Sequence, residues 1–360
     1  MGPTITKWIS LIIVSFSLES QIFTQAQQVP CMFLYGDSQF DTGNNNMLIT
    51  LAKANYPPYG IDYPDGSTGR SSNGKVLPDF LAELVGFASP ISLFVTANGS
   101  DILRGVNYAS GAAGILDESG VLSGGRFTMT RQLTNHQSTI DRIRVLLGNN
   151  QTTVNNYLNK CLYLFNVGSN DYLNNYYLSQ LSLSRLLYTP DRFAQILIQR
   201  FNQQLRTLYT YGARKVAIFG VGLLGCVPQA VANFPTNGST CVDFINNSVQ
   251  LFTNRLPTLI DNLNRDLPAA QFTFINISNI ALGDPSLNGL KVINASCCPV
   301  QRTTGLCVPN EVPCSNRSDY LFWDNFHPTE ISYRALASRS YTSLLPADTY
   351  PVDIQGLIRQ

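Results

Sequence analysis

Short apolar runs alternate with longer segments of helical periodicity along most of the chain. The apolar runs predict β-strands at residues 31–36, 106–109, 162–167, 216–221 and 272–277. The longer segments predict helices at about residues 76–85, 133–147, 192–211, 244–263 and 328–343. In the third of these helices, Phe193, Leu197 and Phe201 recur at the spacing of one helical face. Such alternation predicts a parallel sheet of about five strands with helices on both faces.

The beginning of the chain differs in character from the rest. Lys7 precedes an apolar run of about ten residues, and Thr24 and Ala26 are small residues at suitable places for signal peptidase. Because this run is too short to span a bilayer comfortably, residues 1–26 are expected to be a cleaved secretory signal. No later stretch is long and apolar enough for a membrane helix, and no linker or internal repeat interrupts the chain. We therefore expect a single secreted domain over residues 27–360, without integral membrane association.

The charge balance narrows the range of partners. Only 13% of the 360 residues are charged, the net charge is +1, and the sequence has no basic run. Nucleic acids and anionic membranes attract strongly basic surfaces, so neither is expected to be the main partner. The hydrophobic content of 44% is sufficient for a large core.

Eight cysteines in an exported chain predict disulfide bonds. Cys226 and Cys241 flank a loop rich in proline, glycine and asparagine, and we expect them to pair with each other. A second such loop should contain two bridges among Cys297, Cys298, Cys307 and Cys314. Cys31 and Cys161 each precede a predicted strand, and a bridge can join them if these strands are parallel neighbours. Zinc binding is not favoured, because no Cys-x-x-Cys spacing occurs and the crowded loop contains no histidine.

Seven Asn-x-Ser/Thr sequences could carry glycans on a secreted surface. Asn276 is the least suited, because it lies inside a predicted strand. The remaining glycosylation candidates are Asn98, Asn150, Asn237, Asn246, Asn294 and Asn316.

A candidate nucleophile follows the first predicted strand. The apolar run leads into Gly36, Asp37 and Ser38, and a polar, asparagine-rich loop comes next. This pattern predicts a tight turn that holds the Ser38 hydroxyl at the carboxyl end of the strand. Ligands bind at that edge of open α/β sheets. Since Gly-Asp-Ser is also ordinary turn chemistry, the interpretation depends on partners elsewhere in the chain.

A serine nucleophile needs a base and a carboxylate that orients the base, and the sequence has only two histidines. Asp324 and His327 are three residues apart, so within one turn the carboxylate can reach the imidazole. Pro328 suits the first position of a helix, which would place His327 at a helix entrance. The alternative is that His327 only caps a helix and Asp324 is a turn residue. The competing base, His136, lies on a polar helix face and is expected to be a solvated or hydrogen-bonded surface residue.

Two segments could supply donors for the oxyanion that forms when a serine attacks a carbonyl. Residues 106–114 end a short strand in small residues, which leaves backbone N–H groups open to a ligand. Asn170 follows the strand at residues 162–167 and carries an amide that can donate a hydrogen bond. Both segments should lie near Ser38, because all three follow strands at the same edge of the sheet.

Two other glycine-rich segments do not predict a nucleotide site. Residues 69–75 fit the start of a phosphate-binding P-loop, but Val76 stands where a Ser or Thr must hold magnesium. No strand precedes this segment, so we interpret it as a turn followed by a helix start. Residues 105–114 lack the G-x-G-x-x-G order of a dinucleotide site.

The segments that carry these candidates resemble, in the same order, the secreted plant form of the GDSL lipase/esterases in the SGNH hydrolase superfamily. The resemblance covers nearly the whole mature chain and rests on residues 33–46, 107–114, 167–172 and 322–330. It implies a three-layer α/β/α sandwich of the flavodoxin-like type, which agrees with the alternation of strands and helices. The resemblance further implies Ser38 as nucleophile, His327 as base and Asp324 as orienting acid. It also implies an oxyanion hole formed by the Gly111 N–H, the Asn170 side chain and the N–H of Ser38. No G-x-S-x-G sequence occurs, which argues against the commoner α/β-hydrolase fold.

One residue departs from the family pattern. Gln39 occupies the place of the leucine in Gly-Asp-Ser-Leu. Since Gln39 has none of the roles above, we expect altered packing near Ser38 and not a loss of activity.

Together these features predict a secreted, glycosylated serine esterase/lipase that cleaves carboxylic (acyl or lipid) esters through an acyl-enzyme. Neither a metal ion nor an organic cofactor is implied. Two alternatives remain open. The acyl-enzyme could pass its acyl group to a hydroxyl acceptor, as in an acyltransferase, or the protein could be a catalytically inactive secreted binding glycoprotein.

Overall fold

The computed structural model describes residues 26–179, 183–282 and 290–360. Apart from Ala26, the expected secretory signal lies outside the described residues. Within the described ranges, the helices are all too short or too polar to cross a membrane.

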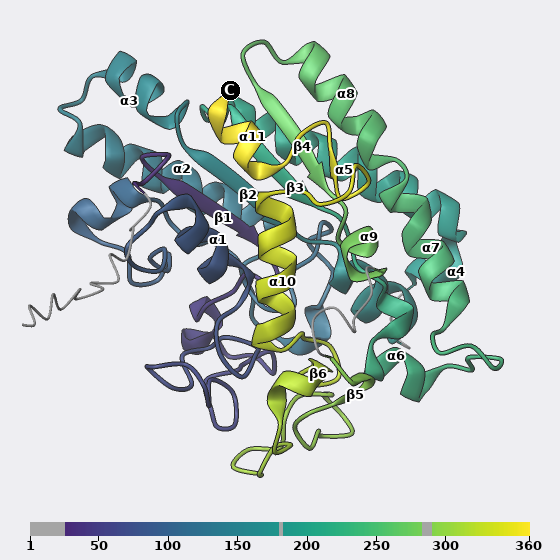
Figure 1. Ribbon diagram of the computed structural model, residues 1–360. Coiled ribbons are helices and arrows are strands. Elements are labelled where there is room, and N and C mark those ends of the chain that lie inside the picture. The colour runs from purple at the N-terminus through teal and green to yellow at the C-terminus, as the bar shows by residue number, and fades with distance from the viewer. Residues whose placement is uncertain (1–25, 180–182, 283–289) are drawn as a thin grey trace, which may run out of the picture.

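A five-stranded sheet forms the centre of the molecule (Figure 1). Its spatial order is β1 (Met32–Gly36), β2 (Leu162–Asn166), β3 (Lys215–Phe219), β4 (Gln271–Ile275) and β7 (Thr349–Tyr350). The first four strands are parallel and in register, with Gly36 beside Asn166 and Asn166 beside Phe219. Their carboxyl ends therefore meet at one edge, whereas β7 adds to β4 in the antiparallel direction. These four strands are almost wholly buried, as expected for a parallel sheet with both faces covered.

The strand expected at residues 106–109 is reduced to isolated bridges. Asn107 pairs in parallel with Leu34 on one side and with Leu93 on the other. Backbone hydrogen bonds follow β1 to its end, from the Leu34 N–H to the Val106 carbonyl and from the Ser110 N–H to the Gly36 carbonyl. When this segment is counted as the second strand, the spatial order of the parallel strands becomes 2-1-3-4-5, which is the order of the flavodoxin-like fold that the family resemblance implied.

Helices cover both faces of the sheet and divide the core into two clusters. One cluster includes Phe33 and Tyr35 of β1 and packs against α2 (Met129–Leu146), α3 (Gln151–Leu158), α5 (Pro190–Thr210), α7 (Asp243–Thr253) and α8 (Leu256–Asp266). The other includes Met32 and Leu34 and packs against α1 (Leu77–Val85), α9 (Ile277–Leu282), α10 (Glu330–Tyr341) and α11 (Ile354–Arg359). In Figure 1, α10 and α11 lie in front of the sheet. The alternation of side chains along each strand thus produces the three predicted layers.

The remaining elements lie in the connections. They comprise the helices α4 (Ser184–Leu187) and α6 (Pro228–Asn233), a π-helical segment at Asp171–Tyr177, and a two-stranded parallel sheet of β5 (Val292–Ser296) and β6 (Tyr320–Phe322). Short 3₁₀ turns occur at Asn44–Met47, Gly99–Arg104, Val121–Ser123, Leu224–Cys226 and Arg317–Asp319.

Two helix predictions need correction. The helix expected at residues 244–263 is two helices, α7 and α8, because Pro257 lacks an N–H and can stand only in the first turn of a new helix. Pro328 is not the first helical residue. Thr329 is the N-cap and α10 begins at Glu330, so the proline lies just before the cap.

All eight cysteines form disulfide bonds. The pairs are Cys31–Cys161, Cys226–Cys241, Cys297–Cys314 and Cys298–Cys307. The bridges predicted from the sequence are therefore confirmed, including the one that joins the amino ends of β1 and β2. Because a bridged sulfur is not a thiolate, none of these cysteines can bind zinc.

Two of these bridges close the segment at residues 297–314, which we call the clamp loop. Its bridged cysteines pack with Tyr59 and with the fully buried Trp323 in a third, small hydrophobic cluster. The clamp loop therefore ties residues near the end of the chain to the loop that contains Tyr59.

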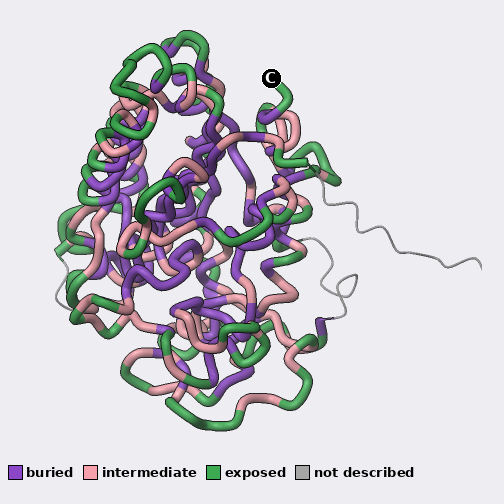
Figure 2. The backbone as a smooth tube through the Cα atoms, turned by 90° about the vertical axis from the view of Figure 1, so that its left-hand side faces the viewer, coloured by how far each residue is buried: buried purple, intermediate pink, exposed green. Residues whose placement is uncertain are grey.

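Figure 2 shows buried backbone running through the centre of the molecule and exposed backbone on the outer turns.

Candidate active site

The turn that carries Ser38 depends on the glycine before it. Gly36 has φ of 146°, and a Cβ on this residue would lie 2.0 Å from the Asn166 carbonyl oxygen of β2. Only glycine can therefore let β1 end this close to its neighbour. The Gln132 side chain of α2 bonds both backbone groups of Gly36, at 2.9 Å to the N–H and 2.8 Å to the carbonyl. This arrangement fixes the strand end from which Ser38 projects.

The structure brings three of the sequence-predicted residues into contact. The Ser38 Oγ lies 2.7 Å from the His327 Nε2, and the His327 Nδ1 lies 2.9 and 2.8 Å from the two carboxylate oxygens of Asp324. Asp324 is fully buried and His327 is 6% exposed. This geometry allows the imidazole to take the serine proton while the carboxylate holds the opposite ring nitrogen.

A tight turn holds Asp324 and His327 together. The Asp324 Oδ1 accepts the backbone N–H groups of Phe326 and His327, each at 2.8 Å. The Trp323 N–H donates to the His327 carbonyl at 2.7 Å, and the Trp323 carbonyl accepts the N–H groups of Cys297 and Cys298. Hydrogen bonds within residues 323–327 therefore hold the turn, and two further bonds attach it to the clamp loop.

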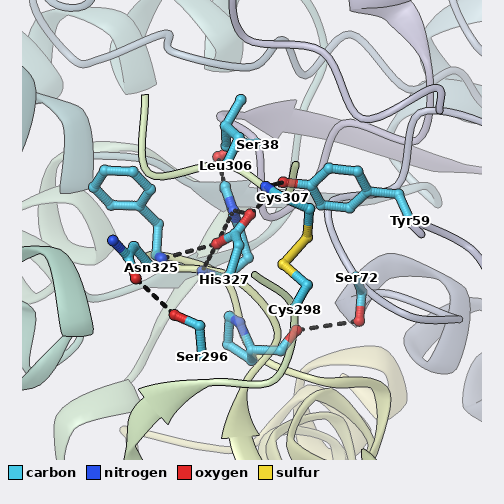
Figure 3. Close-up of polar contacts among 12 residues, drawn as sticks. Ser38, Tyr59, Ser72, Ser296, Cys298, Leu306, Cys307, Asn325 and His327 are labelled. Atoms are coloured by element: carbon cyan, nitrogen blue, oxygen red, sulfur yellow. Dashed lines mark hydrogen bonds and ion pairs between the residues drawn. A yellow bond between two sulfur atoms is a disulfide. The ribbon is translucent and has the colours of Figure 1, made fainter. Parts of the chain in front are cut away.

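Tyr59 is a further partner of Asp324 that the sequence did not indicate. Its hydroxyl donates to the Asp324 Oδ2 at 2.6 Å and accepts the Cys307 N–H at 3.1 Å. In Figure 3, the Tyr59 side chain reaches toward Cys307 and His327, with the Cys298–Cys307 bridge beside it. No local pattern could have identified this contact, because Tyr59 and Asp324 are 265 residues apart.

Two titratable groups beside Ser38 have shifted pKa values. Burial alone would lower the pKa of His327, but the charge and hydrogen bond of Asp324, with a smaller effect of Asp37, hold this pKa above its usual value. Burial raises the pKa of Asp37 to about 7, although the Gln39 N–H and His327 favour its charged form. The Asp37 Oδ2 is buried and has no hydrogen-bond partner among the described residues. A buried carboxyl group thus titrates near neutral pH next to the serine.

Gly111 does not present a free N–H to the site. Its N–H donates to the Asp41 Oδ2 at 3.0 Å. Within the described part of the chain, the N–H groups of Ser38 and Ala112 donate no hydrogen bond, and both residues line the same pocket. The Gly111 N–H is therefore occupied by Asp41, whereas the next residue, the left-handed Ala112, lines the pocket.

Asn170 lines the pocket that contains Ser38, and its amide is held in one orientation. Its Oδ1 accepts from the Asn174 side chain at 2.7 Å, and its Nδ2 donates one proton to the Ala113 carbonyl at 2.9 Å. An amide nitrogen carries two protons, so the second is available to a ligand. Asn170 lines the pocket together with Ser38, Ala112 and His327.

The other polar residues of the motifs organise the loops around these groups. The Asp41 carboxylate accepts the N–H groups of Gly43, Asn44 and Asn45 in addition to that of Gly111. The Asp171 carboxylate accepts the N–H groups of residues 115 and 116 and the Ser119 hydroxyl. Burial raises the pKa of each carboxyl to about 6. The two aspartates thus fix the segment at residues 110–119 from both sides.

The expectation that His136 is a surface residue is wrong. His136 is fully buried in α2, its ring meets Phe33 edge-on at 4.7 Å, and its Nδ1 lies 3.2 Å from the Tyr108 hydroxyl. Burial lowers its pKa to about 3. The polar face of α2 misled the prediction because this face packs against the sheet. His136 does not line the pocket that contains Ser38.

The glycine-rich segment at residues 69–75 is a turn before α1, as expected.

The glycosylation candidates differ in exposure. Asn246 is a poor glycan acceptor, because it is half-buried in α7 and its side-chain oxygen accepts the Gly225 N–H at 2.8 Å. The sequons with exposed asparagines are Asn98, Asn150, Asn237, Asn294 and Asn316.

Ser38 and His327 open into a pocket of about 730 Å³. Much of its wall is apolar, formed by Leu51, Leu122, Leu173, Leu183, Leu187 and Phe326. Several of these side chains are largely exposed at the mouth, and Leu187 is 64% exposed. Gln39 also lines the pocket, where the family pattern has leucine. The arrangement can hold an elongated apolar group next to the serine.

Comparisons with known proteins show the family to which this chain is similar. The sequence profile of the GDSL-like lipase/acylhydrolase family matches residues 32–340. The GDSL esterase/lipase At1g29670 of Arabidopsis thaliana is 46% identical over 364 residues, which cover 99% of each protein. The Arabidopsis thaliana GDSL esterase/lipases At4g18970 and At1g29660 are 45% and 42% identical. They cover 92% and 98% of this chain, and 92% and 96% of their own lengths.

Proposed function

This chain belongs to the GDSL-like lipase/acylhydrolase family and is a carboxylic ester hydrolase, and we propose that it is a secreted serine esterase acting on apolar acyl esters through an acyl-enzyme. The observation that carries this proposal is the 2.7 Å contact between the Ser38 Oγ and the His327 Nε2 beside the buried Asp324. Four disulfides and five exposed sequons support secretion.

In the proposed reaction, Ser38 attacks the ester carbonyl while His327 takes its proton. The imidazolium that forms is stabilised by Asp324, and His327 then gives the proton to the leaving alcohol. A water molecule, activated by the same imidazole, attacks the acyl-enzyme and releases the acid. All three side chains act through contacts of 2.7–2.9 Å in the free protein.

The oxyanion of each tetrahedral intermediate is assigned to three donors. These are the N–H groups of Ser38 and Ala112 and the second amide proton of Asn170. The first two donate no other hydrogen bond among the described residues, and Asn174 fixes the direction of the amide. Donors that are already oriented lower the barrier because they need not reorganise as charge develops.

The apolar wall of the pocket favours esters with an apolar acyl chain. A leucine side chain that becomes buried against a ligand contributes about 1.5–3 kcal/mol. Leu51 and Leu187 line the pocket and are largely exposed in the free protein, so an acyl chain can cover them. Few charged side chains accompany them, namely Asp37, Lys53, Glu118 and Arg302.

The test compares p-nitrophenyl acetate and p-nitrophenyl decanoate as substrates of the purified protein. We expect hydrolysis of both esters, abolished by Ser38→Ala, and free acid as the main product even when an acceptor alcohol is present. Leu187→Glu should lower the decanoate-to-acetate ratio of kcat/KM about tenfold. The matched control is Leu344→Glu, because Leu344 is also largely exposed but does not line the pocket. Hydrolysis that survives Ser38→Ala would contradict the mechanism, and an unchanged ratio in Leu187→Glu would contradict the assignment of the acyl chain.

A further inference from the structure

We propose that Tyr59 is a positioning residue for the acid–base pair: it holds the Asp324 carboxylate against His327, and the clamp loop in turn holds Tyr59. The inference rests on the proposed function, because it concerns the same serine, histidine and aspartate. It adds a residue from a distant loop, and a disulfide bridge, to the groups that determine how His327 titrates.

The hydrogen-bond directions along this chain of contacts are fixed by the chemistry of the groups. The Cys307 N–H can only donate, so the Tyr59 oxygen accepts from it at 3.1 Å. The single Tyr59 proton then goes to the Asp324 Oδ2 at 2.6 Å. Asp324 also accepts two backbone N–H groups, so its remaining acceptor capacity faces the His327 Nδ1. Every donor around Asp324 thus favours an ionised carboxylate oriented toward the imidazole.

Tyr59 is itself held from several sides. It is 1% exposed, and its carbonyl accepts the Ser67 hydroxyl at 2.6 Å. Its ring packs in one cluster with Cys298, Cys307 and Trp323. Since Cys307 is bridged to Cys298, whose N–H bonds the Trp323 carbonyl, the bridge connects the support of Tyr59 with the turn that carries His327. Loss of the bridge should therefore loosen the contact between Tyr59 and Asp324.

The expected effect has a definite sign. Tyr59 partly neutralises the Asp324 charge by its hydrogen bond, so removal of the hydroxyl leaves a carboxylate that attracts the His327 proton more strongly. Tyr59→Phe should therefore raise the pKa of His327. The other titratable groups that face this pair are Asp37 from the end of β1, Tyr56 from the Tyr59 loop and Tyr333 from α10. None of them changes in this variant.

The test uses NMR of the imidazole Cε1–H signals in the full-length disulfide-bonded protein. The protein has two histidines, and the pKa of the buried His136 is lowered to about 3, so His327 alone should titrate between pH 5 and 9. We expect Tyr59→Phe to raise the His327 pKa by about half a unit or more. We also expect kcat/KM at pH 7 to fall roughly tenfold, with the acid limb of the pH profile moved in the same direction.

The matched control is Tyr56→Phe. The Tyr56 hydroxyl donates to the Cys307 carbonyl at 3.0 Å, so this variant removes a neighbouring hydrogen bond to the same residue. Because Tyr56 also interacts with the Tyr59 side chain and with the Asp324 charge, this variant should move the His327 pKa by less than Tyr59→Phe does. An unchanged or lowered pKa in Tyr59→Phe, or an equal rise in Tyr56→Phe, would overturn the proposal.

A pair of disulfide variants tests the support from the clamp loop. The double variant Cys298→Ala/Cys307→Ala should raise the His327 pKa, whereas Cys226→Ala/Cys241→Ala should not. Equal pKa values in the two double variants would overturn this part of the proposal. The NMR titration does not depend on turnover. If the wild type showed no Ser38-dependent hydrolysis, the proposed function would fail while the titration still decided the role of Tyr59.

Discussion

The Asp41 carboxylate binds the Gly111 N–H at 3.0 Å, so the glycine of the small-residue segment is used to shape the site. The same carboxylate gathers the asparagine-rich turn that follows Ser38. The motif residues after the serine therefore hold the neighbouring loop in place. We assign the oxyanion donor of that loop to the Ala112 N–H, which donates no hydrogen bond within the described part of the chain.

This relationship predicts that hydrolysis is sensitive to substitution of Gly111 and tolerates substitution of the adjacent Ala112 by glycine. A Cβ on Gly111 would lie 2.7 Å from the Asn45 Nδ2, which is held by the Ala52 and Gly111 carbonyls. Gly111→Ala should therefore displace the loop and lower kcat at least tenfold. Ala112→Gly keeps the N–H and suits a φ of 68°, so its kcat should stay within about threefold of the wild type. Wild-type kcat in Gly111→Ala would show that the loop position is unimportant.

Asn170→Ala tests the amide donor. Removal of one oxyanion donor costs about 3–4 kcal/mol of transition-state stabilisation, so kcat should fall by about two to three orders of magnitude with little change in KM. Asn174→Ala removes only the partner that orients the Asn170 Oδ1 and should have a smaller effect. Steady-state kinetics with a soluble ester provide the measurement, and equal losses in the two variants would argue against a direct role of Asn170.

The pH dependence of hydrolysis follows from the raised pKa of His327. A general base must be neutral, so kcat/KM should rise with pH and reach its midpoint above about 6.5, the usual value of an imidazole. Asp324→Asn removes the main attraction for the imidazole proton, so this variant should show a lower midpoint in addition to a lower rate. A wild-type midpoint below 6.5 would contradict the electrostatic account.

Asp37 predicts a pH-dependent stability difference. Its pKa is raised from about 3.8 to about 7 in the folded protein, so the folded state binds its proton more tightly than the unfolded state. This stabilisation is complete below about pH 4 and is lost as the pH rises to about 7. Asp37→Asn should therefore gain stability relative to the wild type over this interval, by about 4 kcal/mol in total.

Urea unfolding at pH 4, 5, 6, 7 and 8, with the disulfides intact, measures this difference. Asp65→Asn is the matched control, because the Asp65 side chain is exposed. A difference between the wild type and Asp37→Asn that did not change with pH would show that Asp37 is charged throughout.

The sequence predicted the fold because each central strand is a compact apolar run that is buried on both faces. It failed where Pro257 divides one predicted helix into two, and it overestimated the pairing of residues 106–109, which form only isolated bridges. His136 was misplaced because a polar helix face can be buried when hydrogen bonds and aromatic rings surround it.

For the candidate site, the sequence identified groups whose chemistry is visible in short motifs. Asp324 and His327 are near neighbours in the chain, and Ser38 follows a strand. Tyr59 could not be identified in this way, because its role arises from a contact across 265 residues. The exchange of Gly111 for Ala112 could not be foreseen either, since it depends on which N–H the Asp41 carboxylate occupies.

The most direct test of the central claim is the reaction of the purified protein with a fluorophosphonate probe, followed by mass-spectrometric mapping of the adduct. An activated serine reacts with such a probe, whereas an ordinary surface serine does not. We predict one adduct, on Ser38, that is absent from His327→Ala. An adduct on another serine, or no adduct on the folded protein, would contradict the account.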